Sequence, residues 1–143
     1  MRSLLDVNVW VALFDDGHLF SQRANAFIAK PNRPIASCPI VENGVIRVLS
    51  LPSYAQLGGL PMQAVRERLR QACELLDHEF WPDDVSLRSD ELVDFSRVQG
   101  HNQITDLYLL TLAVRHGGRL VTCDQKIALQ SVKGATAEHL LLL

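Results

Sequence analysis

The chain has 143 residues, of which 48% are hydrophobic and 21% charged, and its formal net charge is −2 at pH 7. A chain of this length buries about 68–70% of its unfolded surface around one core, so we expect a single domain over residues 1–143. The charge excludes a broadly basic nucleic-acid-binding protein. Any grip on RNA or DNA would therefore need a local basic patch.

Neither a membrane protein nor a disulfide-rich secreted protein fits this sequence. The N-terminal apolar run, residues 9–14, is too short for a signal core or a membrane span. Cys38, Cys73 and Cys123 are far apart and form neither a CxxC pair nor a zinc spacing. We therefore expect a cytoplasmic protein with reduced thiols and no membrane contact.

Strand and helix patterns alternate from the start of the chain. The elements predicted first are a strand at 3–5, a helix at 9–14, a helix from about 19 to 30 and a strand at 34–37. Asn8 is the expected N-cap of the first helix, because its side chain can accept a hydrogen bond from the backbone of the first turn. Pro31 ends the second helix.

The segment after the second strand admits two interpretations. Pro39 suits the first turn of a helix that would hold Glu42 and Val45. Asn43-Gly44 is instead a strong hairpin signal, and a glycine inside a helix costs about 1 kcal/mol relative to alanine. The flanking apolar residues follow a helical rather than an alternating period, so the sequence favours the helix.

From residue 52 onward the pattern again alternates. The predicted elements are a loop at 52–61, a helix at 62–77, a strand at 79–81, helices at 90–98 and 104–116, a strand at 120–123, a short helix or turn at 125–130 and a strand at 139–143. Glu67, Arg70 and Glu74 have the i,i+3 and i,i+4 spacing of a solvated, self-paired helix face. Alternating strands and helices indicate an α/β fold with a mostly parallel sheet.

Four carboxylates stand where a predicted core element meets a loop. Asp6 follows the first strand, Glu42 lies early in the helix after the second strand, Asp106 opens the helix at 104–116, and Asp124 ends the strand run 120–123. Strand ends in an open parallel sheet converge on one crevice. Several acids in one crevice raise each other's pKa unless a cation stands between them. The sequence therefore predicts an acidic metal site.

The predicted cofactor is Mg²⁺ (or Mn²⁺), because these hard cations prefer oxygen ligands. Mg²⁺ keeps several waters and takes only one or two carboxylates directly, so two of the four acids can act through water. Taken singly, Asp6 has an ordinary explanation as a turn residue and Asp106 as an acid favoured by a helix N-terminus. The four together favour the metal site.

These motifs resemble those of a known family. Leu5-Asp6-Val7-Asn8-Val9, Glu42-Asn43-Gly44 followed by Arg47, Thr105-Asp106 and Val121-Thr122-Cys123-Asp124 are similar to the motifs of PIN-domain nucleases, and in particular of VapC-type toxins from bacterial toxin–antitoxin pairs. The resemblance covers essentially the whole chain, including the order of the acids. It implies a PIN-like three-layer α/β/α domain with a mostly parallel central sheet. Cys123 departs from the aromatic residue that the family often has there.

The resemblance also implies an activity and its partners. It implies a metal-dependent endoribonuclease toxin that hydrolyses RNA phosphodiester bonds, in transfer or ribosomal RNA, and that is usually a homodimer neutralised by a cognate VapB-type antitoxin. The implied catalytic and metal-binding acids are Asp6, Glu42, Asp106 and Asp124. Polar neighbours that would support them are Asn8, Thr105 and Thr122, while Arg47 would contact RNA or the antitoxin, or pair with an acid.

Two other functions compete with this one. A non-catalytic PIN-like module that binds RNA or a protein is the main alternative, and the four intact acids count against it. A phosphatase or phosphoacceptor of another acidic α/β family needs an acid pair after the first strand. Asp6-Val7-Asn8 supplies only one carboxylate there, which disfavours that class.

Overall fold

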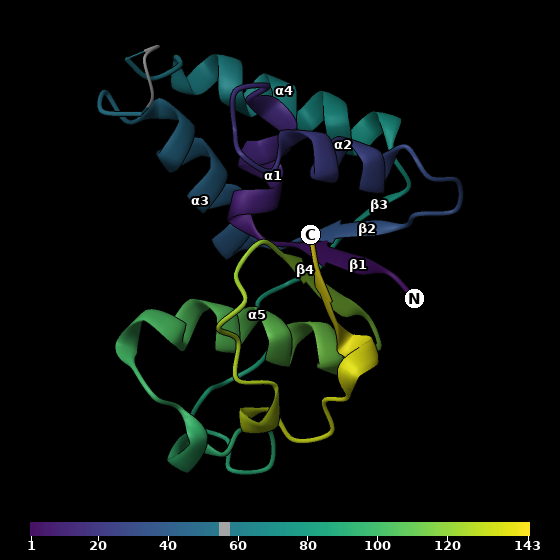
Figure 1. Cartoon of the computed structure of the whole chain (residues 1–143), viewed down its shortest axis with the longest axis vertical. Helices are drawn as coiled ribbons and strands as arrows, with labels where there is room; N and C mark the ends of the chain where they lie inside the picture. Colours follow the sequence, from purple (N-terminus) through teal and green to yellow (C-terminus); the bar gives the residue numbers. More distant parts are fainter. Residues whose placement is uncertain (55–57) are drawn as a thin grey trace.

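The computed structural model describes residues 1–54 and 58–143, and within them five parallel strands form one sheet (Figure 1). In chain order the strands are β1 (Ser3–Leu5), β2 (Ile35–Ser37), β3 (His78–Phe80), β4 (Arg119–Thr122) and β5 (Leu140–Leu142). Their spatial order is β3-β2-β1-β4-β5, with every neighbouring pair parallel. The expected parallel sheet is confirmed, and β1 lies at its centre.

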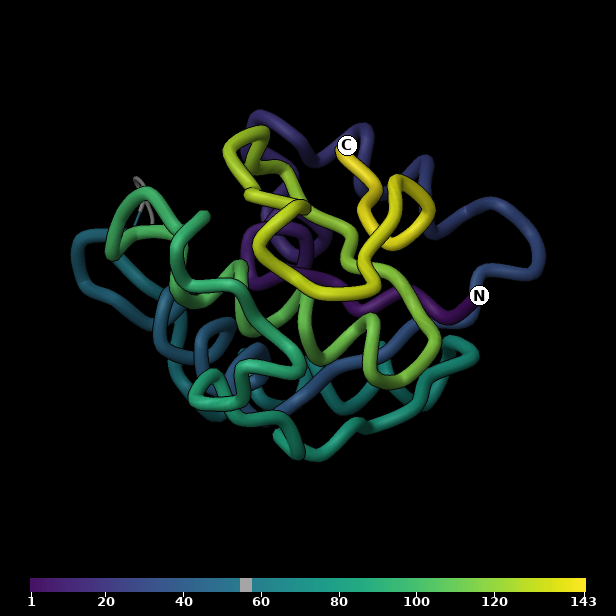
Figure 2. The backbone as a smooth tube through the Cα atoms, turned by 90° about the horizontal axis from the view of Figure 1, so that it is seen from below, coloured from purple at the N-terminus to yellow at the C-terminus, as the bar shows by residue number. Residues whose placement is uncertain are grey.

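Helices cover both faces of the sheet. The α-helices are α1 (Val7–Phe14), α2 (Ser21–Ile28), α3 (Pro39–Ser50), α4 (Met62–Leu75) and α5 (Ile104–Arg115). The first four lie on one side and α5 on the other (Figure 1). Seen from the α5 side, the segments before and after α5 wrap around it over that face (Figure 2). The PIN-like α/β/α arrangement is therefore confirmed.

The core lies between the sheet and the two helical layers. Leu4, Leu5, Leu120 and Val121 from the central strands are fully buried. Runs of strand residues that are buried on both faces are typical of parallel sheets. None of the helices in residues 1–54 and 58–143 is both long and apolar enough to cross a membrane.

Two predicted local structures are wrong. The first helix begins at Val7, and its N-cap is Asp6 rather than Asn8, because the Asp6 carboxylate accepts the Val7 backbone N–H. Residues 90–98 form no α-helix. Val93 instead makes an isolated antiparallel bridge with Val132, and only a 3-10 turn, Phe95–Arg97, follows it.

Tertiary pairing accounts for the loss of the helix at 90–98. The Asp94 N–H donates to the Ser131 carbonyl at 2.8 Å, and the Lys133 N–H donates to the Leu92 carbonyl at 2.9 Å. The backbone groups that a helix would use are therefore engaged with residues about forty positions later. Other boundaries shift by a few residues, as helix ends commonly do. The loop predicted at 52–61 includes residues 55–57, which lie outside the described residues.

Asn43 and Gly44 lie inside α3, so the helical interpretation is confirmed. The structure also explains the glycine. A Cβ built on Gly44 would lie 2.6 Å from Val7 Cγ2, because α3 crosses close to the first turn of α1 at this point. Although a glycine weakens the helix, Gly44 is needed here because a larger residue would prevent α3 from packing against Val7.

We predict that Gly44→Ala lowers the free energy of unfolding by about 1–3 kcal/mol through overpacking, although alanine is the better helix former. Urea denaturation measures the change. Adding Val7→Ala should recover part of the loss, with Val7→Ala alone as the reference. A Gly44→Ala protein as stable as its parent would show that the helices are not in tight contact here.

Candidate metal centre

The carboxyl ends of β1 and β4 carry two of the predicted acids side by side. Leu5 lies opposite Val121 in the parallel register, so Asp6 and Thr122 follow at adjacent positions. Asp124 comes just after β4, and Asp106 stands in the first turn of α5. The fold therefore brings acids from three separate elements to one edge of the sheet, which is where parallel sheets place their sites.

Asp6 is held by two hydrogen bonds in a site that is only 5% exposed. Its Oδ1 accepts the Val7 N–H at 2.6 Å, and its Oδ2 accepts the Thr122 hydroxyl at 3.0 Å. The Thr122 Oγ1 in turn accepts the Asp124 N–H at 3.1 Å. Thr122 thereby joins the ends of β1 and β4 and fixes the spacing of Asp6 and Asp124. Thr122, which the sequence predicted to support the acids, thus contacts Asp6 and Asp124 through its hydroxyl.

Burial and repulsion by neighbouring charges oppose ionisation of Asp6 and Asp106. Burial raises the pKa of Asp6 above its usual range, the two hydrogen bonds lower it, and the nearby Asp124 charge raises it again. For Asp106, burial and then the charges of Asp6 and Asp124 raise the pKa to about 6. Within the described residues, no cationic side chain is among the groups that shift either pKa. Asp6 and Asp106 therefore lie close enough to Asp124 to be affected by its charge, without a cation that offsets the effect on their pKa values.

An oxygen-only set of three acids fits a hard divalent cation by its donor chemistry. In the described residues, however, no three His, Cys, Asp or Glu side chains already converge closely enough to enclose an ion. Mg²⁺ retains water ligands and binds one or two carboxylates directly, so a closed protein cage is not required. The donor set is compatible with a hydrated Mg²⁺ or Mn²⁺.

Glu42 is placed differently from the other three acids. Its Oε1 accepts the Ser37 hydroxyl at 2.6 Å, and the same Ser37 Oγ lies 2.8 Å from His78 Nε2. Because the single hydroxyl proton goes to Glu42, His78 must donate its Nε2–H to Ser37. Burial lowers the pKa of His78, and the Glu42 charge opposes that shift. Glu42 does not appear among the groups that shift the pKa of Asp6 or Asp106.

A cavity of about 410 Å³ lies beside Glu42, between α3, α4 and β3, and Cys73 and His78 also line it. Sequence reasoning found Glu42 but missed Ser37 and His78. Ser37 ends the strand just before Glu42, and a histidine follows the predicted helix at 62–77, yet nothing in the sequence pairs these segments. The pairing arises only from the parallel register of β2 and β3.

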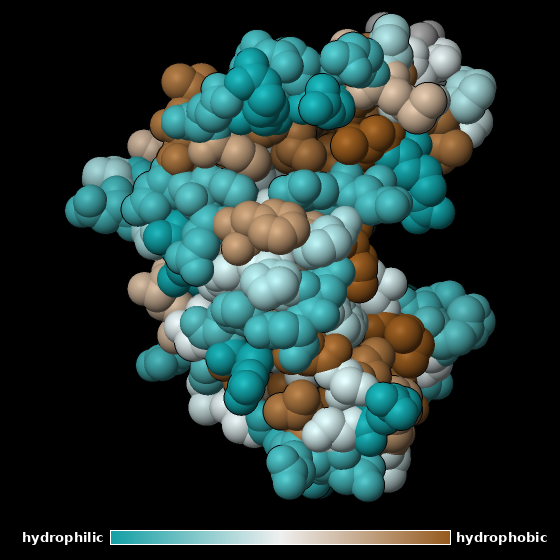
Figure 3. Space-filling view, turned by 180° about the vertical axis from the view of Figure 1, so that it is seen from behind, coloured by the Kyte–Doolittle hydropathy of each residue, from teal (hydrophilic) through white to brown (hydrophobic). Residues whose placement is uncertain are grey.

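The remaining predicted residues lie at the surface. Asn8 is exposed in the second position of α1 and lines a pocket with Asp124. Thr105 is exposed one residue before Asp106. Arg47 is exposed on α3 and lines a cavity with Asn43 and Met62, and none of the three acids is among the residues that line this cavity. Figure 3 shows a notch between the part of the molecule formed by α1–α4 and the part around α5.

Comparison with known proteins identifies the family. The PIN domain family matches residues 3–133. The chain belongs to the PIN-domain family. It is 45% identical to Ribonuclease VapC44 of Mycobacterium tuberculosis over 144 residues, which is 100% of both chains. It is 38% identical to Ribonuclease VapC39 of the same species over 129 residues, which covers 90% of this chain and 92% of the relative.

A solved structure supports the same PIN fold. The crystal structure of VapBC2 from Rickettsia felis bound to a DNA fragment from their promoter matches with a TM-score of 0.57. The match covers 100% of this chain and 98% of the other, at 19% sequence identity. At that identity the likeness bears on the fold alone, and it agrees with the layered parallel sheet described above.

We predict that Thr122→Val in this PIN domain weakens Mn²⁺ binding by about 10- to 100-fold, because the acid Asp6 loses the hydroxyl that orients it. Isothermal titration calorimetry gives the affinity. Thr122→Ser keeps the hydroxyl and should bind Mn²⁺ nearly as the parent does. Unchanged binding by the valine variant would remove Thr122 from the account of the site.

Proposed function

We propose that this chain is a metal-dependent endoribonuclease of the VapC type, which hydrolyses phosphodiester bonds in RNA. The observation that carries the proposal is the position of Asp6, Asp106 and Asp124 at one edge of the sheet, where the charges of Asp6 and Asp124 add to burial in raising the pKa of Asp106. The acids occur in a chain that is 45% identical to a ribonuclease over its full length. Within that family frame, the uncompensated acidic site favours a metal-assisted hydrolase over a passive module.

Asp6, Asp106 and Asp124 would hold a Mg²⁺ or Mn²⁺ ion. Bound there, the ion would lower the pKa of a water molecule and offset negative charge on the phosphate. Thr122 and the Val7 N–H hold the Asp6 carboxylate in one orientation. Asp124 is fixed in its turn because its Oδ1 accepts the Lys126 N–H at 2.8 Å. These contacts preorganise the acids before RNA arrives, which lowers the cost of reaching the reactive geometry.

Glu42 is assigned to the same catalytic centre, on the strength of its position in the family motif. Its carboxylate would reach the other acids only after leaving the Ser37 hydroxyl. The hydrogen bond from His78 to Ser37 stabilises the position away from the acids, so Ser37 and His78 would control how often Glu42 is available. Asn8 and Thr105, both exposed near the acids, would contact water or substrate.

The partners of the chain are part of the same proposal. A VapB-type antitoxin would neutralise the enzyme, and the homodimer is its expected assembly. The Rickettsia felis structure is of a VapBC2 complex, and it contains a chain whose fold is similar to this one. A basic side chain of the antitoxin, laid across Asp6, Asp106 and Asp124, would cancel their mutual repulsion as a metal does. Transfer or ribosomal RNA is the proposed substrate, in the cytoplasm.

We predict that the purified protein cleaves RNA at discrete positions only with Mg²⁺ or Mn²⁺, and that Asp106→Asn lowers the rate by about 100-fold or more. The reason is the loss of one of the acids that hold the cation. Mapping of new 5′ ends in total bacterial RNA, with metal or with chelator, measures the effect. Asp90→Asn, a change at an exposed loop acid, is the matched control.

The folded state of the variant is checked by thermal unfolding without metal. Because Asp106→Asn removes one of three mutually repelling charges, the variant should be at least as stable as the parent. A folded Asp106→Asn protein with full activity would contradict the proposed mechanism. Absence of metal binding in the parent would favour the non-catalytic binding module instead.

We further predict that separating the chain from its antitoxin raises RNA cleavage, and that adding the antitoxin back in a stoichiometric amount lowers cleavage to near background. Cleavage of the mapped RNA at fixed metal concentration measures both steps. Binding of the antitoxin is followed separately by size-exclusion chromatography. Equal activity of the free chain and of a stoichiometric complex would refute the neutralising contact.

A further inference from the structure

A second hollow adjoins the acidic centre and has no role in the mechanism above. It is a pocket of about 400 Å³. Its lining residues come from the start of α1, the α1–α2 connection and the turn after β4: Asn8, His18, Leu19, Phe20, Cys123 and Asp124. Asp124 therefore belongs to both the acidic centre and this pocket. A molecule bound at Asp124 would therefore lie next to this pocket.

The α1–α2 connection that forms one wall is built by its own hydrogen bonds. The His18 N–H donates to the Asp15 carbonyl at 3.0 Å, and the Phe20 N–H donates to His18 Nδ1 at 3.2 Å. Because Nδ1 accepts this bond, a neutral His18 carries its proton on Nε2. The wall thus holds an aromatic ring and an imidazole N–H donor in fixed relation to each other.

The ring of Phe20 is paired with a cation. The Arg23 guanidinium lies 5.6 Å from the Phe20 ring centroid, and the His18 ring centroid lies 6.2 Å away at a tilt of 42°. Aromatic rings with adjacent arginines are the usual platforms for unpaired bases of single-stranded nucleic acid.

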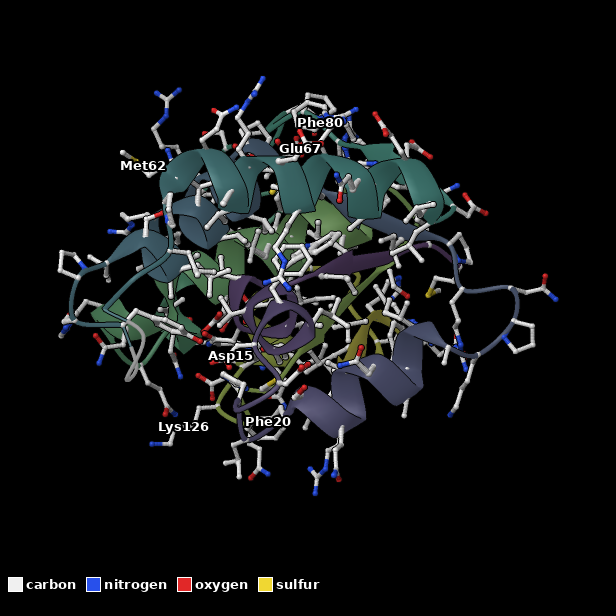
Figure 4. All side chains as sticks on the ribbon, turned by 90° about the horizontal axis from the view of Figure 1, so that it is seen from above. Asp15, Phe20, Met62, Glu67, Phe80 and Lys126 are labelled. Carbon is white, nitrogen blue, oxygen red and sulfur yellow. The ribbon has the colours of Figure 1, made fainter. Side chains whose placement is uncertain are left out.

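The exposure of this wall favours a stacked ligand. Leu19 is 88% exposed, and Phe20 is only partly buried, so apolar surface is open to solvent beside Asp124. Phe20 and Lys126 lie at the same edge of the molecule, whereas Phe80 lies at the opposite edge (Figure 4). Asn8 supplies an amide that can both donate to and accept from a base edge. The pocket therefore combines a π-face with hydrogen-bonding groups, and the Arg23 guanidinium lies next to the ring that supplies the π-face.

We propose that this pocket binds the nucleobase of a nucleotide that flanks the scissile phosphate, with the base stacked on Phe20. The inference rests on the proposed ribonuclease function, since the acidic centre places the phosphate next to Asp124. Arg23 supports the ring and offsets charge of the neighbouring phosphate. Asn8 and the Nε2–H of His18 contact the base edge and select among bases. Phe20 is thus a specificity-determining residue rather than a catalytic one.

The test measures whether Phe20 and one base act as a pair. Short RNAs spanning the mapped cut carry either the natural base or an abasic ribose on each side of the scissile phosphate. Phe20→Leu keeps apolar bulk but removes the π-face, and Phe20→Tyr keeps the ring. The matched control is Phe80→Ala, which removes an exposed aromatic ring on β3 at the far edge. The value of kcat/KM is measured for every combination of protein and RNA.

We expect Phe20→Leu to lower kcat/KM by about 5- to 150-fold on the complete RNA, which corresponds to about 1–3 kcal/mol of stacking. On the RNA that lacks the stacked base, Phe20→Leu and the parent should be equal. Phe20→Tyr and Phe80→Ala should cleave the complete RNA as the parent does. Thermal unfolding midpoints of all the variants are compared, so that a loss of folded protein is not counted as a loss of binding.

Other outcomes overturn the inference. If Phe20→Leu cleaves every RNA at the parent rate, the pocket does not bind a base. The same conclusion follows if, at both flanking positions, Phe20→Leu lowers kcat/KM by the same factor on the abasic RNA as on the complete RNA. Weaker antitoxin binding by Phe20→Leu with unchanged RNA cleavage would assign the pocket to the protein partner instead. A parent protein that cleaves no RNA in any metal would refute the nuclease itself. These failures are distinguishable because the parent is assayed on the same RNAs.

Discussion

The Asp6 carboxylate connects the start of α1 to the ends of β1 and β4, and the rest of the site depends on this connection. It caps α1 through the Val7 N–H and accepts the Thr122 hydroxyl from the neighbouring strand β4, so one buried side chain joins a helix start to two strand ends. An aspartate N-cap contributes about 1 kcal/mol to helix stability. That contribution opposes the cost of burying a carboxylate whose pKa burial has raised. These two hydrogen bonds therefore hold a buried carboxylate in place although burial opposes its ionisation.

Charge repulsion is the second constraint on this edge of the sheet. Asp6 follows β1, Asp124 follows β4, and Asp106 lies in the first turn of α5. The backbone positions of the three acids therefore cannot move apart without disturbing β1, β4 or α5. A cation, or a basic side chain of a partner, relieves the repulsion without any change of fold. The catalytic cation and a basic side chain of the antitoxin would then bind to the same excess of negative charge in the free protein.

Much of this arrangement could be predicted from the sequence, because the ends of the predicted strands determine where the acids lie. Asp6 and Asp124 follow short apolar runs, and in a parallel sheet such runs must deliver their next residues to one edge. The α/β order and the helical interpretation of Asn43-Gly44 were predictable from periodicity. The reason for Gly44 was not, because Val7 approaches it only in the packed structure.

Features that depend on contacts between distant segments were not predictable in this way. The apolar spacing at 90–98 suggests a helix, but pairing with residues 131–133 determines the backbone there. The orientation of Glu42 depends on Ser37 and on His78 in an edge strand much later in the chain. The pocket at Phe20 likewise joins the α1–α2 connection to the turn after β4. Local sequence patterns do not indicate which distant segments of the chain come into contact.

We propose that Asp6, Asp106 and Asp124 form the metal centre. Anomalous scattering from crystals of the antitoxin-free protein grown with Mn²⁺ would locate the ion. We expect a manganese peak within coordination distance of at least one of these three carboxylates and bounded by the others, with waters completing the shell. A well-ordered crystal at saturating Mn²⁺ with no peak there, or with its only peak beside Glu42, Cys73 and His78, would show that these acids are not the metal centre.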